Sequence, residues 1–203
     1  MSYIIRKNKQ GTDGWLKDRA EKMTASNATA IGNNGKGLDT YINNLMAETY
    51  SSAIKESYTN EDMERGNELE ALARTVYEME TGDEVEEVGF IELDDFTGCS
   101  PDGLIGEEGG LEVKCLKDEK YFKVLLEGIE TVLSDYIWQI QMCLYVSDRK
   151  WWDLVLYNPN YKKSILILKV YPDKKYIDKL IIGLETGKEK IKLIKDKYNK
   201  LIK

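Results

Sequence analysis

The most informative stretch of this chain is residues 100–114, which read SPDGLIGEEGGLEVK. The Pro-Asp-Gly turn and the glycine-rich middle, with apolar residues on either side, predict a hairpin. Successive side chains of a strand alternate between its two faces, so Glu112 and Lys114 point the same way while Val113 faces the core. Asp102 enters from the turn. The stretch therefore predicts two carboxylates and one ammonium group close together.

This combination of groups suits chemistry on a phosphodiester with a divalent cation. Mg²⁺ prefers carboxylate, carbonyl and water oxygens, and one or two carboxylates plus a substrate phosphate are its usual complement. Lys114 would orient an attacking water or offset charge on the phosphate. Each half also has an ordinary explanation, since Pro-Asp-Gly is a common turn and Glu-x-Lys a common exposed pair. Their combination across one apolar hairpin favours the metal-dependent interpretation.

Composition limits the domain organisation and the compartment. The chain has 203 residues, of which 42% are hydrophobic and three are prolines, so we expect one domain over residues 1–203 without a flexible linker. No apolar run approaches the roughly 20 residues that span a bilayer, and the first residues lack a signal-peptide pattern. We expect a soluble protein of the cytoplasm that does not contact a membrane.

The absence of histidine excludes several kinds of catalysis. Ser-His-Asp and Cys-His mechanisms, His-based zinc proteases and zinc deaminases all require it. Cys99, Cys115 and Cys143 form no Cys-x-x-Cys pair and have apolar neighbours, which predicts buried reduced thiols rather than a zinc or iron–sulfur site. A site built on two carboxylates needs no histidine.

The distribution of charge matters more than its sum. The net charge of −7 argues against a nucleic-acid partner at first. From Tyr171 to Lys203, however, ten lysines stand against five acids. Such a lysine-rich terminal helix is more often a solvated face than a DNA contact.

Local patterns predict the order of the elements. Asp13 is expected to cap a short helix carrying Trp15 and Arg19, residues 24–27 to cap the next helix, and residues 31–38 to form a loop. Further helices are expected from Tyr41 and over 61–80, 119–127, 134–146 and about 173–202, the last capped by Asp173. Strands are expected over 85–93, from Cys99, and over 110–115, 151–157 and 165–171, the first three as an antiparallel meander. This order predicts an α/β (α+β) fold with a central mixed sheet covered by helices.

Motifs along most of the chain carry a family resemblance. The hairpin residues resemble the motif of the PD-(D/E)xK nuclease superfamily, whose fold is like that of restriction endonucleases. Eight ordered blocks between about Gly11 and Tyr161 resemble, more narrowly, the phage lambda exonuclease family, also called the YqaJ-like viral recombinases. The blocks are Gly14-Trp15-Leu16 with Arg19, Thr24-Ala25-Ser26, Arg65-Gly66-Asn67-Glu68-Leu69-Glu70, Ala73-Arg74 with Tyr77-Glu78, Ser100-Pro101-Asp102-Gly103-Leu104, Glu112-Val113-Lys114-Cys115, Tyr136-Ile137-Trp138-Gln139-Ile140-Gln141, and Trp151-Trp152-Asp153.

The resemblance implies an enzyme, a deoxyribonuclease that requires Mg²⁺, for which Mn²⁺ would substitute. It would digest one strand of duplex DNA from the 5′ end and leave 3′ single-stranded tails for recombination by single-strand annealing. The implied metal ligands are Asp102, Glu112, Glu70 and the backbone carbonyl of Val113. Lys114 would serve the attacking water, and Gln139 matches the active-site glutamine of the family.

The resemblance also implies a pocket for the 5′ phosphate of the DNA end. The matching positions are Arg19, Ser26 and Ser100, and an arginine fork with hydroxyls is good chemistry for a terminal phosphate. Lys120 stands where the best-known member has a further arginine, which keeps the charge but loses bidentate geometry. Gln141 is a further expected DNA contact.

Partners and alternatives follow from the same resemblance. It implies a homotrimeric ring around DNA and a phage single-strand annealing protein as partner, in a bacterial host. Two other functions remain open from the residues alone. One is an endonuclease or single-strand nuclease of the same fold, and the other is a noncatalytic protein that binds DNA ends.

Overall fold

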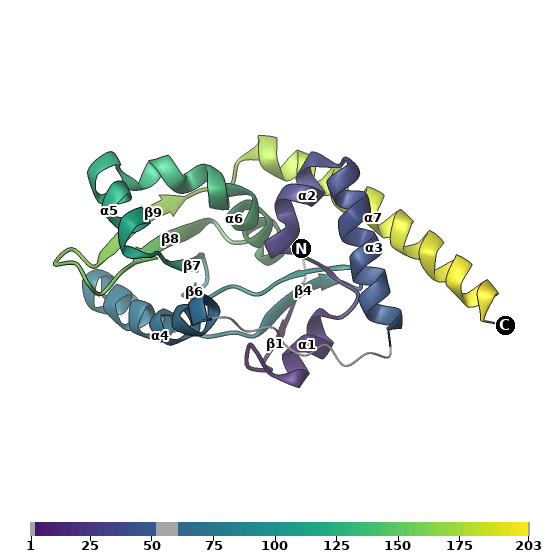
Figure 1. The fold of residues 1–203 in the computed structure, drawn as a ribbon, viewed down its shortest axis with the longest axis horizontal. Coiled ribbons are helices and arrows are strands. Elements are labelled where there is room, and N and C mark those ends of the chain that lie inside the picture. Colours follow the sequence, from purple (N-terminus) through teal and green to yellow (C-terminus); the bar gives the residue numbers. More distant parts are fainter. Residues whose placement is uncertain (1–2, 52–60, 203) are drawn as a thin grey trace.

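A five-stranded mixed sheet forms the centre of the structure, a computed structural model that describes residues 3–51 and 61–202 (Figure 1). The strand order is β3-β6-β7-β8-β9, with bounds Val85–Glu86, Gly103–Ile105, Gly109–Cys115, Trp151–Tyr157 and Ile165–Val170. The central neighbours β7 and β8 are parallel, and the other pairs are antiparallel. The hairpin expected within residues 100–114 is β6–β7, and its pairing with β8 places it inside the sheet.

Helices cover both faces of this sheet because its strands present apolar side chains alternately to each face. On one face, Leu111 and Val113 pack with Ala73 and Tyr77 of α4 (Glu61–Thr81). On the other face, the larger core joins the sheet to α5 (Asp118–Glu127), the short helix η2 (Ile129–Val132) and α6 (Leu133–Ser147). The expected fold class, a mixed sheet covered by helices, is confirmed.

The strands expected to form one meander belong to two sheets, the five-stranded sheet and a second, smaller one. The strand order of the smaller sheet is β1-β4-β5-β2, with bounds Ile4–Arg6, Phe90–Asp94, Thr97–Cys99 and Met23–Thr24. Here β4 and β5 pair with each other, whereas β3 pairs with β6 in the larger sheet, so residues 100–102 carry the chain from one sheet to the other. Polar and apolar alternation predicts strands but not their partners, and β1 and β2, with three and two residues, are too short to give a pattern.

The N-terminal helices differ from expectation in two places. The cap of α1 (Asp13–Arg19) is Thr12, whose hydroxyl accepts a bond from the backbone N of Trp15, and not Asp13. The expected loop over residues 31–38 is mostly helical. After η1 (Ala25–Asn27), α2 (Ala28–Asn33) and α3 (Lys36–Tyr50) are separated by two residues, of which Asn34 has a left-handed φ of 46°. Ile31 and Leu38 are fully buried, so tertiary packing overrides the low helix propensity of this glycine- and asparagine-rich segment.

The long helix α7 (Lys174–Leu201) closes the fold, and its C-terminal part extends beyond the other elements in Figure 1. As expected, Asp173 caps it by accepting a bond from Lys175 N at 2.8 Å. The helix packs closely on α2, because a Cβ at Gly183 would lie 1.9 Å from the carbonyl oxygen of Ile31. Lys188 pairs with Asp94 at 2.9 Å, and Lys190 and Lys195 pair with Asp39 and Glu21. Part of the lysine-rich face therefore makes ion pairs within the chain.

Two expectations about composition can be compared with the described residues. Cys99 and Cys143 are free and buried as expected, while the free thiol Cys115 is only partly buried. Within residues 3–51 and 61–202, every helix is either too short or too polar to cross a bilayer.

Candidate active site

The turn before β6 holds Asp102 beside β7. The backbone N of Asp102 donates to Leu111 O at 3.2 Å, and the backbone N of Val113 donates to Asp102 Oδ2 at 2.7 Å. Gly103 lies opposite Leu111 in the hairpin register. The aspartate carboxylate is thereby fixed next to the strand that carries the glutamate and the lysine.

Glu112 is the buried centre of the site. Its side chain is fully buried, and Lys114 Nζ lies 2.5 Å from its Oε1 atom, on the same face of β7 as alternation predicts. Gln139 on α6 donates to the same oxygen at 2.5 Å. Among the residues that the structure describes, nothing donates a hydrogen bond to the other oxygen, Oε2, although that atom is buried.

Glu70 reaches the same site from α4. Its carboxylate pairs with Arg74 one helical turn later, and its charge acts on both Asp102 and Glu112. Arg74 also donates to the carbonyl oxygen of Asp102 at 3.4 Å and pairs with Glu87 at 2.9 Å. Glu70 is thus close enough to act electrostatically on Asp102 and Glu112, and Arg74 joins Glu70 to the backbone of Asp102.

Burial and repulsion raise the pKa values of the two central carboxyl groups. The pKa of Asp102 lies well above its ordinary value, first because of desolvation and then because of the charges of Glu112 and Glu70. Desolvation also raises the pKa of Glu112, against the opposing effect of Lys114. Desolvation lowers the pKa of Lys114, but Glu112 and Asp102 outweigh it and the pKa is raised. Lys114 is therefore an ammonium group at neutral pH.

These donors suit a hard divalent cation bound together with a substrate. The buried Oε2 of Glu112 lacks a partner among the described residues, which is unfavourable unless a proton or a cation meets it. No group of three or more Asp, Glu, Cys or His side chains in the described part of the chain is arranged to hold a metal. Mg²⁺ commonly takes one or two carboxylates and completes its shell with water and substrate phosphate. The pair formed by Asp102 and Glu112 fits this open type of site.

Arg19 and Ser100, two of the residues expected to bind a terminal phosphate, are both in contact with Trp15, which was not expected there. Arg19 Nη1 donates to Ser100 Oγ at 2.9 Å, and Trp15 Nε1 donates to the same hydroxyl at 2.9 Å. The Arg19 guanidinium also lies over the Trp15 ring, 4.3 Å from its centroid. The spacing of four residues on one helix could have revealed this pair, since such residues share a face. Ser100 lies two residues before Asp102, so the arginine is tied to the carboxylate site.

Ser26 lies in a neighbouring group of hydroxyls. Its Oγ atom is 3.2 Å from Thr24 Oγ1, and the backbone N of Thr24 donates to Tyr41 Oη at 3.0 Å. Burial lowers the pKa of Arg19, while the Tyr41 hydroxyl opposes this shift. Tyr41 was not expected at the site, because nothing in its local sequence connects it with Arg19.

Lys120 and Lys114 both lie near the ring of Tyr136. Lys120 Nζ is 5.6 Å from the centroid of Tyr136, and Lys114 Nζ is 5.5 Å from the same centroid. Lys120 also pairs with Asp135 at 3.2 Å. Tyr136, which belongs to one of the motif blocks, is a further residue that the sequence reasoning did not assign to the site.

Gln141 is not part of the site, and its expected role as a DNA contact is corrected. Its side chain is fully buried; Nε2 donates to Tyr171 O at 2.8 Å, and Oε1 accepts from Asp173 N at 2.7 Å. Residues two apart on a helix point in nearly opposite directions. Because Gln139 faces Glu112, Gln141 faces away and joins α6 to the segment before α7.

Comparison with solved structures defines the class of fold. An alkaline exonuclease (LHK-Exo) from Laribacter hongkongensis matches with a TM-score of 0.78 and 28% identity, over 94% of this chain and 100% of that chain. The same protein in complex with dAMP matches with a TM-score of 0.79, at the same identity and coverage. A phage related exonuclease from Haemophilus somnus 129PT shares the fold at 16% identity, with a TM-score of 0.61 over 86% of this chain and 96% of that chain. The fold is of the PD-(D/E)xK type.

The family follows from the sequence match. Residues 14–150, more than half of the chain, match the model of the YqaJ-like viral recombinase domain. The chain therefore belongs to the YqaJ-like viral recombinase family, as the motif blocks indicated. No curated protein matches it.

Proposed function

We propose that this protein is a Mg²⁺-dependent exonuclease that degrades one strand of double-stranded DNA from the 5′ end and leaves 3′ single-stranded tails. The proposal rests on the contacts of the Glu112 carboxylate. Lys114 and Gln139 hold one of its oxygens. The other oxygen is buried near Asp102, without a partner among the described residues. The alkaline exonuclease that shares 28% identity supports the class of reaction.

Asp102 and Glu112 would hold the metal, with the backbone carbonyl of Val113 and the carboxylate of Glu70 as further ligands. Mn²⁺ would substitute, since carboxylate and carbonyl oxygens suit both ions. When bound, Mg²⁺ would polarise the scissile phosphate and lower the pKa of the attacking water. Glu70 already pairs with Arg74, so Arg74 would keep that carboxylate oriented toward the other two.

Lys114 would act as an electrostatic and positioning group. Its Nζ atom lies 2.5 Å from Oε1 of Glu112, and Glu112 and Asp102 raise its pKa against the effect of desolvation. Its ammonium group would orient the nucleophile and stabilise charge that develops on the phosphate. Gln139 would keep Glu112 in the rotamer that leaves Oε2 free, because its amide holds the opposite oxygen.

The DNA end would be recognised by its 5′ phosphate. Arg19 and Ser100, already in contact, would bind the phosphate together with Ser26, and Lys120, which lies near the ring of Tyr136, would contribute a second cation. The Laribacter hongkongensis protein was solved with dAMP, a 5′ mononucleotide of the kind that this reaction would release.

The biological setting is proposed from the family. The 3′ tails would be substrates for recombination by single-strand annealing, with a phage annealing protein as partner, in the cytoplasm of a bacterial host. A homotrimer that encloses the duplex would make the digestion processive.

Labelled DNA tests the proposal directly. Linear duplex labelled at the 5′ or the 3′ end would be incubated with Mg²⁺ or a chelator, beside a covalently closed circle. We expect Mg²⁺-dependent release of the 5′ label, an intact circle, no activity in Lys114→Ala, and normal activity in the control Lys123→Ala, which changes an exposed lysine of α5. Cutting of the circle would identify an endonuclease, and inactivity on every substrate would favour a noncatalytic end-binding protein.

A further inference from the structure

Strand β9, at the edge of the larger sheet, has backbone groups that point away from the sheet. Just before β9, Asn158 N donates to Ser164 O at 2.9 Å. The backbone groups of Ser164 therefore point toward the chain that leaves β8. Residues of an antiparallel pair alternate between facing the partner strand and facing away from it. In the register of β8 and β9, the residues that direct their N–H and C=O groups outward are Ile165, Ile167 and Lys169.

Side chains form hydrogen bonds with the outward backbone groups just before and just after β9 but, among the described residues, not with those of β9 itself. Before the strand, Lys163 O accepts a bond from Tyr121 Oη at 2.8 Å. After the strand, Gln141 bonds to Tyr171 O at 2.8 Å and to Asp173 N at 2.7 Å. In the part of the chain that the structure describes, no hydrogen bond reaches the outward backbone groups of β9 itself. These groups form a template for one more strand.

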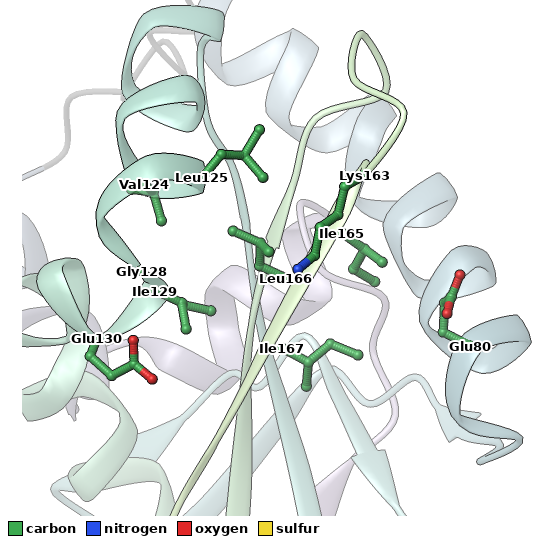
Figure 2. A pocket seen from close by; sticks show the side chains of 10 residues that line it. All are labelled: Glu80, Val124, Leu125, Gly128, Ile129, Glu130, Lys163, Ile165, Leu166 and Ile167. Carbon is green, nitrogen blue, oxygen red and sulfur yellow. The ribbon is translucent and has the colours of Figure 1, made fainter.

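The open part of the edge lies in a groove (Figure 2). A pocket of about 370 Å³ follows β9 from Lys163 to Ile167. Figure 2 shows Leu125 and Ile129, at the end of α5 and in η2, on one side of the strand, and Glu80 of α4 on the other. Because helices flank the edge on both sides, a single extended segment fits there better than the broad sheet of a second copy.

The lining of the groove indicates the composition of that segment. On the side of α5 and η2 the lining is mainly apolar, with Leu125, Ile129 and Leu166, and Glu130 stands beside them. On the side of α4, Ile165 and Ile167 are accompanied by the carboxylate of Glu80. Alternate side chains of an added strand point to opposite sides of the sheet. A segment whose apolar residues face α5 and η2, and whose lysine or arginine residues face α4, would match the more apolar side and the carboxylate of Glu80.

We propose that this groove, the β9 groove, binds an extended segment of a partner protein as an added edge strand, with apolar and basic residues alternating along it. Main-chain bonds to Ile165 and Ile167 would give affinity, and the flanking side chains would give specificity. None of the residues that line the groove belongs to the carboxylate site, so the inference does not depend on the proposed nuclease activity.

Fluorescence anisotropy with a labelled hexapeptide of alternating valine and lysine tests the proposal. We expect saturable binding to the full-length protein. Two further peptides would carry backbone N-methyl groups on the valines or on the lysines. Only one of these two sets of N–H groups faces β9 in an added strand, so one methylated peptide should bind at least about tenfold more weakly than the other.

A matched pair of protein variants locates the binding. Ile167→Pro removes an outward N–H group without removing a bond to β8, which is the position where an edge strand tolerates proline. Ile167→Val keeps the N–H group and most of the apolar surface. We expect about tenfold weaker peptide binding by the proline variant and a change within about twofold for the valine variant. Thermal unfolding of both variants checks the fold.

Hydrogen exchange on the unaltered protein gives a readout that does not depend on the variants folding. Peptide should slow exchange of the Ile165 and Ile167 amides. Absence of peptide binding, unchanged exchange at these two amides, or equal affinity of both methylated peptides would overturn the proposal. Self-association in sedimentation that Ile167→Pro abolishes would assign the edge to a second copy of the chain and would also overturn it.

Discussion

Lys114 and Gln139 hold the same carboxylate oxygen of Glu112, each at 2.5 Å from Oε1. The lysine comes from β7 and the glutamine from α6, so a sheet and the helix that covers it converge on one atom. The second oxygen of Glu112 is left buried and without a partner among the described residues. Two donors therefore fix one side of this carboxylate and leave its other oxygen available for a further contact.

Replacing the lysine should stop catalysis. Lys114→Ala removes the ammonium group that would stabilise charge on the phosphate, and we expect a loss of at least about 100-fold in the rate of DNA digestion. Circular dichroism should show a folded protein. A rate within about twofold of the unaltered protein would remove Lys114 from the mechanism, and Lys123→Ala serves as the control.

Without a bound metal, the charged carboxylate of Asp102 should destabilise the folded protein. Asp102→Asn keeps the acceptor for Val113 N but removes a charge whose pKa is raised by desolvation and by the charges of Glu112 and Glu70. A raised pKa in the folded state means that stability falls as pH rises from the unfolded pKa through the folded pKa. We expect a Tm about 2–5 °C above that of the unaltered protein near pH 8. The difference should vanish near pH 3, where both states of Asp102 are protonated. A lower Tm for Asp102→Asn near pH 8 would contradict the prediction.

Metal binding should become tighter as pH rises. The pKa values of Asp102 and Glu112 are both raised, chiefly by desolvation, so protons compete with the cation for these oxygens. Calorimetric titration of Mg²⁺ into the protein without DNA should give a higher apparent affinity near pH 8.5 than near pH 6. An affinity that does not change over this range would argue against ligation by these carboxylates. Asp102→Asn should weaken binding at both pH values.

The arginine near the turn should determine the preference for phosphorylated ends. Arg19→Ala should reduce the rate on 5′-phosphorylated duplex by about tenfold or more and have less effect on 5′-hydroxyl duplex, because it removes a guanidinium contact with the phosphate. Trp15→Phe, which loses the bond from Trp15 Nε1 to Ser100 Oγ, should reduce the same preference to a smaller extent. Equal losses on the two substrates in Arg19→Ala would reject the phosphate pocket. Arg6→Ala changes a half-exposed arginine paired with Glu92 and serves as the control.

The two glutamines of α6 should behave differently. Gln141→Leu leaves Tyr171 O and Asp173 N without their partners, and we expect it to lower the free energy of unfolding by about 1–3 kcal/mol. Gln139→Leu should instead reduce catalysis with less effect on stability, since its amide bonds to the carboxylate of Glu112. Chemical unfolding and digestion rates of both variants check this contrast. Equal effects of the two variants on both measurements would contradict it.

Sequence alone determined the parts of this protein that depend on local periodicity. Strand alternation placed Glu112 and Lys114 on one face, the apolar run predicted β8 at Trp151–Tyr157, and Asp173 marked the start of α7. Each of these follows from the backbone geometry of a few neighbouring residues. The order of motif blocks added the family.

Tertiary structure alone decided which elements meet. It divided the meander between two sheets and placed Gln141 in the core. The family resemblance implied that Gln139 shares a site with Glu112, and Arg19 with Ser100, but only the structure shows the hydrogen bonds that join them across 27 and 81 residues. Tertiary structure also left the middle of β9 open between two helices. These relationships depend on the packing of surfaces from distant parts of the chain, and local periodicity carries no information about which surfaces become neighbours.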